Sequence, residues 1–401
     1  MANDLRYRHA RNEADRLGQV FTPESVADLL LDTLPAPSQG VRQIIDLGAG
    51  EGALTHAALE RHPNSSALLV EIDALHVETL LATMPKNTRI VKGDALDIGW
   101  EAGLKADIVI SNPPYGMLPL TESIIAMLSK TSLQVPTNGG WVRGDAAFVA
   151  RAWMCATQGT GVGLIVASPL IRDPSFRQLR KILVNQLRGL CITQLDTNVF
   201  YGAEVQAFLI TGMRSPSRKR KVLLRKASIN GTIVDELEIG WNDAVNRLDF
   251  DYYRIMEKLG ASSSLVPDTL ASVGTSIVRG SRSNNDFKNL GLEAFHTTDF
   301  KRFSGELPLN GHHPNYKIAR PGDILIPRVG SRCLLNQARV IRGEGLFTDC
   351  VYRLCVTPHA GERVWRTISS SFGTEWRLAN ASGNCAKHLT VQTLLGMPLF
   401  S

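Results

Sequence analysis

VRQIIDLGAGEG, residues 41–52, is the stretch that decides the fold. It opens with an apolar run that predicts a strand over Val41–Asp46, and it closes with Gly48, Gly50 and Gly52. Glycine lets a chain turn tightly from a strand into a helix and lets the backbone approach a ligand closely. A GxGxG loop alone is weak evidence for a nucleotide site, and this one lacks the Gly-Lys-Ser/Thr ending of a Walker A loop.

Downstream of this loop, short apolar runs alternate with helical patterns. Further strands are predicted over Ala67–Glu71, Arg89–Lys92, Asp107–Ser111, Gly163–Ala167, Cys191–Leu195 and Gln206–Thr211. Helices are predicted over Ala53–Arg61, Ala74–Thr83 and Ala146–Gln158. This alternation predicts an α/β fold, a doubly wound Rossmann-like domain with a mostly parallel sheet and helices on both faces. Ligands of such sheets bind outside the carboxyl ends of the strands.

Three acidic residues, Asp46, Glu71 and Asp94, each follow or end one of the first three predicted strands. A carboxylate at Glu71 can accept hydrogen bonds from both ribose hydroxyls of a nucleoside. A carboxylate at Asp94 can accept one from the amino group of an adenine ring. Each acid alone is more often a solvated surface residue, but the series of three predicts a nucleoside site.

The tetrapeptide Asn112-Pro-Pro-Tyr115 directly follows the predicted strand Asp107–Ser111. Two prolines stop a strand and fix the backbone direction, which a simple strand terminator would also do. The amide oxygen of Asn112 and the carbonyl of Pro113 can both accept hydrogen bonds from an amino group. Tyr115 adds an aromatic face for stacking. The combination predicts a catalytic site that acts on an amino group.

Together these motifs resemble those of amino-methyltransferases. The segment Gly18-Gln-Val-Phe-Thr-Pro-Glu24 resembles the N-terminal motif of gamma-class N6-adenine DNA methyltransferases, and it precedes the glycine loop as it does in that class. The resemblance spans about residues 15–212. It implies S-adenosylmethionine as the cofactor and adenine as the methylated base.

The resemblance also implies a role for each site residue. The cofactor would be held by Phe21, Thr22, Asp46, Gly48, Gly50, Glu71 and Asp94. In the family the segment containing Phe21 and Thr22 closes over the methionine end of the cofactor. Catalysis would fall to Asn112, Pro113, Tyr115 and Phe200. Phe200, in Asn198-Val-Phe-Tyr-Gly202, matches the position of an aromatic residue that stacks on the target base.

All of the excess positive charge lies in the second half of the chain. Residues 215–401 carry 25 Lys or Arg against 17 Asp or Glu, whereas residues 1–214 carry 19 against 21. This asymmetry is expected if one half performs chemistry and the other holds a polyanion, although an inert basic surface would also produce it. The basic junction Ser215–Lys221 suggests a methyltransferase domain over 1–214 and a mixed α+β DNA target-recognition domain over 215–401.

Three stretches of the second half resemble the target-recognition domains of type I restriction specificity subunits: Leu270–Gly280, Pro321–Ser331 and Ser382–Thr390. Arg328, within the second of these, and Arg332, just after it, flank Gly330. Arginines in such a setting suit contacts with the DNA backbone or with base edges, and ordinary surface arginines are the alternative.

Other classes of function find little support. None of the six cysteines forms a CxxC pair, so we expect reduced thiols and no metal, with His296, His312 and His313 leaving a metal site as the alternative. The sequence has no uncharged apolar run of membrane-spanning length, and its first residues have no apolar signal core. We therefore expect a cytoplasmic monomer without membrane contact.

The prediction is a site-specific enzyme that methylates N6 of adenine in duplex DNA after flipping the base out of the stack. A separate restriction endonuclease as partner, and a role in restriction-modification or self-protection, are left open. The alternatives are a protein glutamine-amide methyltransferase, an RNA methyltransferase, and a DNA-binding specificity subunit with an inactive first half.

Overall fold

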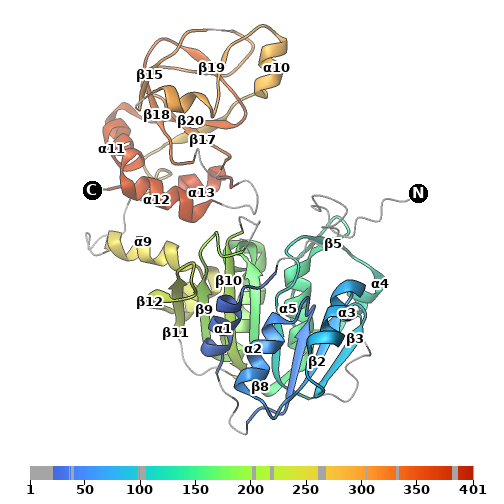
Figure 1. Cartoon of the computed structure of the whole chain (residues 1–401). Helices are drawn as coiled ribbons and strands as arrows, with labels where there is room; N and C mark the ends of the chain where they lie inside the picture. Colours follow the sequence, from blue (N-terminus) through green and yellow to red (C-terminus); the bar gives the residue numbers. More distant parts are fainter. Residues whose placement is uncertain are drawn as a thin grey trace. The chain divides into compact units, whose positions relative to one another are not determined.

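The computed structural model describes residues 21–35, 37, 40–97, 99, 105–200, 205–216, 221–260, 268–303, 305–311, 313–330, 334–381 and 387–400. The chain divides into two compact units, Met1–Phe250 and Asp251–Ser401 (Figure 1). Part of the Gly18–Glu24 motif, residues 18–20, lies outside the described residues, as do Arg332, His312 and residues 382–386 of the tail.

Unit 1 is built on a nine-stranded sheet with the order β12-β11-β9-β10-β8-β4-β1-β2-β3. Its strands are β1 (Gln43–Leu47), β2 (Ser66–Glu71), β3 (Thr88–Lys92), β4 (Ala106–Ser111), β8 (Ala156–Ala167), β9 (Leu187–Gln194), β10 (Ala207–Arg214), β11 (Lys221–Ala227) and β12 (Ile233–Gly240). Five neighbouring strands, β3, β2, β1, β4 and β8, run parallel to one another. Strand β10 lies between β8 and β9 and runs antiparallel to both. The predicted mostly parallel sheet is confirmed.

The chain order reverses between β1 and β4. From β1 the sequence continues outward through β2 to β3, and it then returns to the other side of β1 at β4. In an open α/β sheet, such a reversal leaves a crevice at the carboxyl ends of the two central strands, which is where ligands bind. The glycine loop follows β1 and the Asn112–Tyr115 tetrapeptide follows β4, so the two motifs flank this crevice.

Helices cover both faces of the sheet. Adjacent residues of β1, Ile44 and Ile45, point to opposite faces, and both are buried. The helices and 3-10 turn of unit 1 are α1 (Glu24–Thr33), α2 (Ala53–Arg61), α3 (Ala74–Thr83), α4 (Glu122–Lys130), α5 (Gly144–Cys155), α6 (Ser168–Arg172), η2 (Pro174–Phe176), α7 (Arg177–Gln186) and α8 (Trp241–Asn246). A small sheet of β5 (Met117–Pro119), β7 (Trp141–Arg143) and β6 (Thr137–Asn138) lies between β4 and α5 in the sequence.

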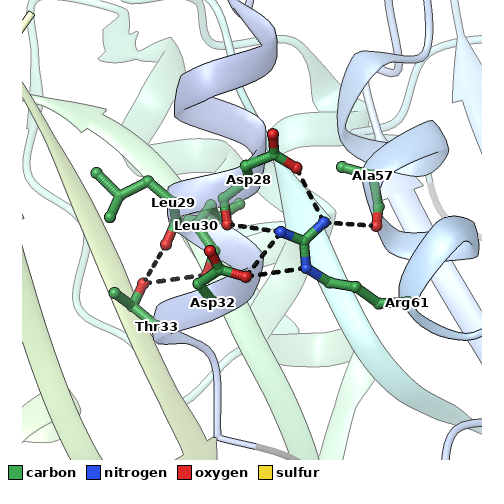
Figure 2. A network of polar contacts seen from close by, with 7 residues as sticks. All are labelled: Asp28, Leu29, Leu30, Asp32, Thr33, Ala57 and Arg61. Carbon is green, nitrogen blue, oxygen red and sulfur yellow. Dashed lines mark hydrogen bonds and ion pairs between the residues drawn. The ribbon is translucent and has the colours of Figure 1, made fainter. Parts of the chain in front are cut away.

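An arginine joins the first two helices. Arg61, at the end of α2, forms ion pairs with Asp28 at 2.9 Å and Asp32 at 2.7 Å on α1 (Figure 2). It also donates to the backbone carbonyls of Ala57 and Asp28. The arginine therefore ties α1, which follows Phe21, to the helix that follows the glycine loop.

The structure places the division between the units later than the predicted boundary after Arg214. Strand β11 pairs with β9, and β12 pairs with β11, so both extend the sheet of unit 1. Val222 and Leu224 of β11 are buried. The basic junction that suggested a linker lies between two strands of one sheet, and the helix α9 (Phe250–Gly260) begins at the division.

Unit 2 is a mixed α+β structure with its own apolar cores. One sheet has the order β13-β20-β17-β18-β15, and a smaller one has the order β14-β19-β16. Its strands are β13 (Ser276–Arg279), β14 (Ala294–Phe295), β15 (Glu306–Pro308), β16 (Ile318–Ala319), β17 (Ile324–Pro327), β18 (Ala338–Arg342), β19 (Gly345–Phe347) and β20 (Val351–Cys355). Its helices and 3-10 turn are α10 (Asn284–Asn289), η3 (Asp299–Arg302), α11 (Pro358–Ser369), α12 (Ser371–Asn380) and α13 (Val391–Leu395).

Candidate functional site

The carboxyl ends of β1, β2 and β4 surround a cavity in unit 1. It is lined by Phe21, Thr22, Gly48, Ala49, Gly50, Glu51, Ala53, Leu54, Glu71, Ile72, His76, Asn112, Pro114 and Phe148. The predicted cofactor residues Phe21, Thr22, Gly48, Gly50 and Glu71 are thus brought together, with Asn112 beside them. Sequence reasoning missed His76 and Phe148, which come from α3 and α5.

The glycine loop leaves little room for a side chain at its first glycine. Gly48 has a φ of 69°, and a Cβ added to it would lie 3.2 Å from the ring of Phe148. The left-handed conformation and the close ring both favour glycine at this position. The loop is held to β2, because the Gly48 and Ala49 amides both donate to the carbonyl of Val70.

Glu71 is buried at the end of β2, and its carboxylate holds the backbone of two segments that line the cavity. Its Oε1 accepts from the amides of Ile72 at 2.9 Å and Asp73 at 2.8 Å, and its Oε2 accepts from Gly50 at 2.8 Å. A carboxylate has room for about four hydrogen bonds. Three of them are used by the backbone, so Glu71 has capacity for about one ribose hydroxyl where the sequence suggested two.

Asp46 lies beneath the loop and is fully buried. Its Oδ2 accepts from the hydroxyl of Thr55 at 2.7 Å, while Oδ1 has no hydrogen-bond partner within the described part of the chain. Burial raises the pKa of Asp46 to about 7, and the nearby Glu71 carboxylate adds to the rise. This carboxyl is therefore poised to become charged when a cation approaches, because a nearby positive charge favours the ionised form.

The segment before α1 reaches the same cavity. Phe21 is 55% exposed, and its ring meets that of His76 edge to face at a centroid distance of 5.8 Å. Thr22 accepts a hydrogen bond at 2.9 Å from the Nδ2 of Asn112. The residue predicted for cofactor closure thus also orients the predicted catalytic amide.

The amide of Asn112 is held from both ends. Its Nδ2 donates to Thr22, and its Oδ1 accepts at 2.9 Å from the hydroxyl of Tyr115. The strand that precedes it is tied to β1, because Ser111 Oγ donates to the carbonyl of Leu47 at 2.6 Å. The amide oxygen therefore has a fixed orientation at the cavity, with one acceptor position used by Tyr115.

The two predicted stacking rings lie in the core in this structure. Tyr115 is 5% exposed and Phe200 is 2% exposed, and both belong to one apolar cluster. Burial, with a contribution from the Asp145 carboxylate, raises the pKa of Tyr115 well above its usual value, so its hydroxyl remains a neutral donor. Neither ring presents an open face, and stacking on a base requires both to become accessible.

One helix, α5, contacts the three loops that carry the motifs. Phe148 faces the glycine loop. The buried Arg151 donates to the carbonyls of Ala95 at 2.8 Å and Asp97 at 2.6 Å, in the loop that contains Asp94. Asp145 pairs with Arg143, which donates to the carbonyl of Tyr115 at 3.1 Å. The stretch Gly144-Asp-Ala-Ala-Phe148, at a predicted helix start, was the only sequence signal for this role.

Asp94 is half-buried at the end of β3, and its Oδ1 accepts from the amide of Leu96 at 3.0 Å. Among the described residues, the cavity lining does not include Asp94, Asp46, Pro113, Tyr115 or Phe200. Pro113 is buried beside Asn112 in the tetrapeptide. The predicted adenine contact of Asp94 therefore stays a prediction.

The cavity fits the predicted cofactor. A sulfonium and an ammonium cation suit a site with the buried, unsatisfied Asp46 carboxyl beneath it and Glu71 in its wall. The Phe148 ring against Gly48 offers an apolar surface for a purine. Within the described ranges, no group of three or more His, Cys, Asp or Glu residues could hold a metal ion. No helix in the described part is long and apolar enough to cross a membrane.

Unit 2 gathers the three stretches that resemble specificity subunits. Strands β13 and β17 both pair with β20, and Gly330 donates to the carbonyl of Lys387 at 2.9 Å. Arg279 forms an ion pair with Asp349 at 2.7 Å, and Arg328 donates to the Asp349 carbonyl at 2.8 Å. Arg328 is half-buried, so part of its guanidinium has a structural contact.

Comparisons with known proteins point in the same direction. The family described as N-6 DNA Methylase matches residues 5–239. The ribosomal RNA large subunit methyltransferase G of Magnetococcus marinus is 33% identical over 107 residues, which cover 25% of this chain and 28% of that protein. The release factor glutamine methyltransferase of Bacillus subtilis is 37% identical over 109 residues, which cover 25% of this chain and 36% of that protein.

A solved structure resembles nearly the whole chain. The type IIG restriction endonuclease BpuSI matches with a TM-score of 0.51 at 11% identity, covering 95% of this chain and 58% of that one. At this identity the similarity concerns the fold alone. The chain spans less than half the length of the curated relatives named above.

Proposed function

Because this chain belongs to the N-6 DNA Methylase family, with S-adenosylmethionine as its cofactor, we propose that it methylates the N6 amino group of adenine in duplex DNA. The family match covers the glycine loop, Glu71 and the Asn112–Tyr115 tetrapeptide. The adenine specificity, the DNA substrate and the roles of single residues are parts of this proposal.

The observation that carries the proposal is the held amide of Asn112. It lines the cofactor cavity, its Nδ2 donates to Thr22 and its Oδ1 accepts from Tyr115. An amide oxygen has two acceptor positions. One position accepts from the Tyr115 hydroxyl, and in the proposed mechanism an N–H of the target amino group also donates to this oxygen.

The tetrapeptide would activate a poor nucleophile. The lone pair of an adenine amino group is delocalised into the ring. Hydrogen bonds from its two N–H groups to Asn112 Oδ1 and to the carbonyl of Pro113 favour the form with the lone pair localised on nitrogen. When bound, S-adenosylmethionine supplies an electrophilic methyl group. Holding the two reacting atoms in line accounts for much of the rate.

Cofactor binding would use other residues that line the cavity. The Glu71 Oε2 has capacity for a ribose hydroxyl beside its bond to Gly50. Phe148 would contact the purine, and the Phe21–Thr22 segment would cover the methionine end. Asp46 would balance the positive charge of the cofactor from beneath the loop.

Base binding requires a rearrangement of the core rings. Tyr115 and Phe200 can sandwich a flipped base only after they leave their buried positions. The Tyr115 hydroxyl would then release Asn112 Oδ1, which frees its second acceptor position. In this way, arrival of the base and availability of the acceptor are coupled.

Unit 2 is proposed as the DNA target-recognition domain. Residues 251–401 carry 18 Lys or Arg against 12 Asp or Glu, so the net charge of +6 of the whole chain resides in this unit. A cationic unit beside a charge-balanced one suits binding to a polyanion. The setting would be restriction-modification or self-protection, with a separate restriction endonuclease as the expected partner in the first case.

The substrate can be tested by offering equal amounts of duplex DNA, RNA and a glutamine-containing peptide with methyl-labelled cofactor. We expect label in DNA, with N6-methyladenine as the modified nucleoside after enzymatic digestion. Label only in RNA or only in peptide would replace the proposal with the activity named for one of the curated relatives. Binding of DNA without label in any substrate would favour a specificity subunit.

A further inference from the structure

Asp145 is a buried carboxylate that the proposed chemistry does not use. It is the second residue of α5, and it has no exposed surface. Its Oδ1 accepts from Arg143 Nε and from the Ala146 amide, both at 3.0 Å. Its Oδ2 accepts from Arg143 Nη2 at 3.0 Å and from the Ala167 amide at 3.1 Å. These four donors occupy the acceptor positions of the Asp145 carboxylate.

The pair that Asp145 makes with Arg143 reaches the catalytic tetrapeptide. Arg143 Nη2 also donates to the carbonyl of Tyr115 at 3.1 Å. Ala167 is the last residue of β8, and β8 lies next to β4, the strand that leads into Asn112. The pair therefore links the tetrapeptide after β4 to the carboxyl end of the neighbouring strand.

The segment that carries the pair lies directly against the tetrapeptide. The Gly144 amide donates to the carbonyl of Gly116 at 2.8 Å. A Cβ added to Gly144 would lie 2.5 Å from the carbonyl oxygen of Pro114, so only glycine fits. Downstream of the tetrapeptide, Met117 pairs with Arg143 in the small sheet. The tetrapeptide and the chain that follows it are therefore anchored to the same few residues.

Stability alone does not explain a buried ion pair at this place. Removing two charges from water is costly, and apolar residues of similar volume often stabilise a protein equally well or better. An apolar pair, however, could neither donate to the Tyr115 carbonyl nor accept from the Ala146 and Ala167 amides. The forked guanidinium makes these contacts at once, because its donors lie in one rigid plane.

We propose that Arg143 and Asp145 are positioning residues that fix the orientation of the Asn112–Tyr115 tetrapeptide for the transfer step. This inference rests on the proposed function, since it assumes that the tetrapeptide acts on the substrate amino group. Neither side chain needs to touch the cofactor or the base. Their effect acts through the backbone of Tyr115, and hence on where the Asn112 oxygen lies.

The matched control is another arginine of unit 1 that bridges two elements through carboxylates, Arg61. Arg61 pairs with Asp28 and Asp32 and donates to two backbone carbonyls, as Figure 2 shows. Its side chain is 27% exposed, against 17% for Arg143. It joins α1 to the far end of α2, and its hydrogen-bond and ion-pair partners among the described residues lie on these two helices, away from the tetrapeptide.

The test compares Arg143→Lys and Arg143→Met with Arg61→Lys and Arg61→Met in the full chain. For each variant, single-turnover methylation gives a rate constant and an amplitude, and titration gives the cofactor affinity. Misplacement of a reacting group by about 1 Å can cost about 10²-fold in rate. We expect a loss of about this size in rate constant for Arg143→Met and a smaller one for Arg143→Lys. Amplitude and cofactor affinity should be unchanged.

If the pair had only a structural role, its loss would lower the amplitude, which measures the fraction of folded enzyme, and would leave the rate constant unchanged. Wild-type rate constants in folded Arg143 variants would overturn the proposal, as would equal slowing by the Arg61 variants. If Arg143→Met does not fold, Arg143→Lys decides, because it keeps a charge beside Asp145. The rates are compared on whichever substrate the wild type methylates. If the wild type does not methylate DNA, the proposed function is refuted, and the role of Arg143 and Asp145 can still be tested on the substrate that it does methylate.

Discussion

Gly48 shows how one residue without a side chain defines the cofactor site. A non-glycine residue at its φ of 69° would cost roughly 1–2 kcal/mol, and its Cβ would press on the Phe148 ring. Because the added Cβ would displace the Phe148 ring that lines the cavity, we expect Gly48→Ala to weaken cofactor binding by about tenfold, or about 1.4 kcal/mol. Calorimetric titration with S-adenosylmethionine measures this.

Gly159→Ala is the matched control for this prediction. Gly159 also has a positive φ, 95°, but a Cβ there would meet nothing within 4 Å, and it lies near the start of β8. Its substitution should cost similar backbone strain and leave cofactor affinity at the wild-type value. Equal affinities for wild type and Gly48→Ala would remove the glycine loop from the cofactor site.

Asp46 gives the cofactor-free protein a defined pH dependence. Its pKa rises from 3.8 to about 7 on folding, chiefly through burial. Between these pH values the folded state keeps a proton that the unfolded state has lost, so stability falls as pH rises through this window. At about 1.36 kcal/mol per pKa unit, the loss amounts to about 4 kcal/mol.

Urea unfolding of wild type and Asp46→Asn at several pH values tests this. The asparagine cannot ionise, so the wild type should lose unfolding free energy relative to the variant from pH 4 to pH 7. Parallel curves for the two proteins would mean that Asp46 is ionised in the fold. Binding of the cationic cofactor should lower the pKa of Asp46 and release a proton near neutral pH.

At the scale of elements, sequence periodicity predicted unit 1 well. Helices Ala53–Arg61 and Ala74–Thr83 begin and end as expected, and each expected strand of the first half is present. The Asn112–Tyr115 tetrapeptide and the glycine loop were expected at the sheet edge, and they share a cavity wall. These features depend on local pattern and on the general geometry of parallel sheets.

What the sequence could not predict depends on contacts between distant elements. Arg143 and Asp145 resemble a surface pair two residues apart, and only the packing of α5 reveals their contacts with Tyr115 and Ala167. Phe200 has the expected position in sequence, but tertiary packing buries its ring. The basic stretch before β11 resembles a linker in its composition, and only the long-range pairing of β11 with β9 shows that the next strand belongs to unit 1.

This pairing predicts how the chain can be divided. A protein ending after Arg214 would lack β11 and β12 and would expose the edge of β9, whereas one ending after Phe250 keeps the sheet complete. Exposed strand edges favour aggregation. We therefore expect residues 1–250 to be soluble and to bind cofactor, and residues 1–214 to aggregate when expressed under the same conditions. Gel filtration of both distinguishes these outcomes, and a monomeric, cofactor-binding 1–214 protein would argue against the revised division.

At the scale of the whole molecule, the two units differ in net charge. Residues 1–250 carry 26 Lys or Arg and 26 Asp or Glu, whereas the net charge of +6 lies beyond them. Contacts with about 6–10 phosphates would lower affinity by about 10³–10⁵ between 50 and 200 mM salt. Anisotropy titrations should show steep salt dependence for the full chain and weak binding for residues 1–250. Equal affinity and slope for the two proteins would mean that unit 2 does not hold DNA.

The most direct test of the central claim is single-turnover methylation of duplex DNA by wild type and Asn112→Ala, with the product nucleoside identified. The wild type should form N6-methyladenine. Loss of one positioned polar group commonly costs about 10²–10³ in rate, so Asn112→Ala should be slower by about this factor while it still binds cofactor and DNA. A folded Asn112→Ala protein that methylates adenine at the wild-type rate would contradict the account, as would a wild type whose product is any other nucleoside.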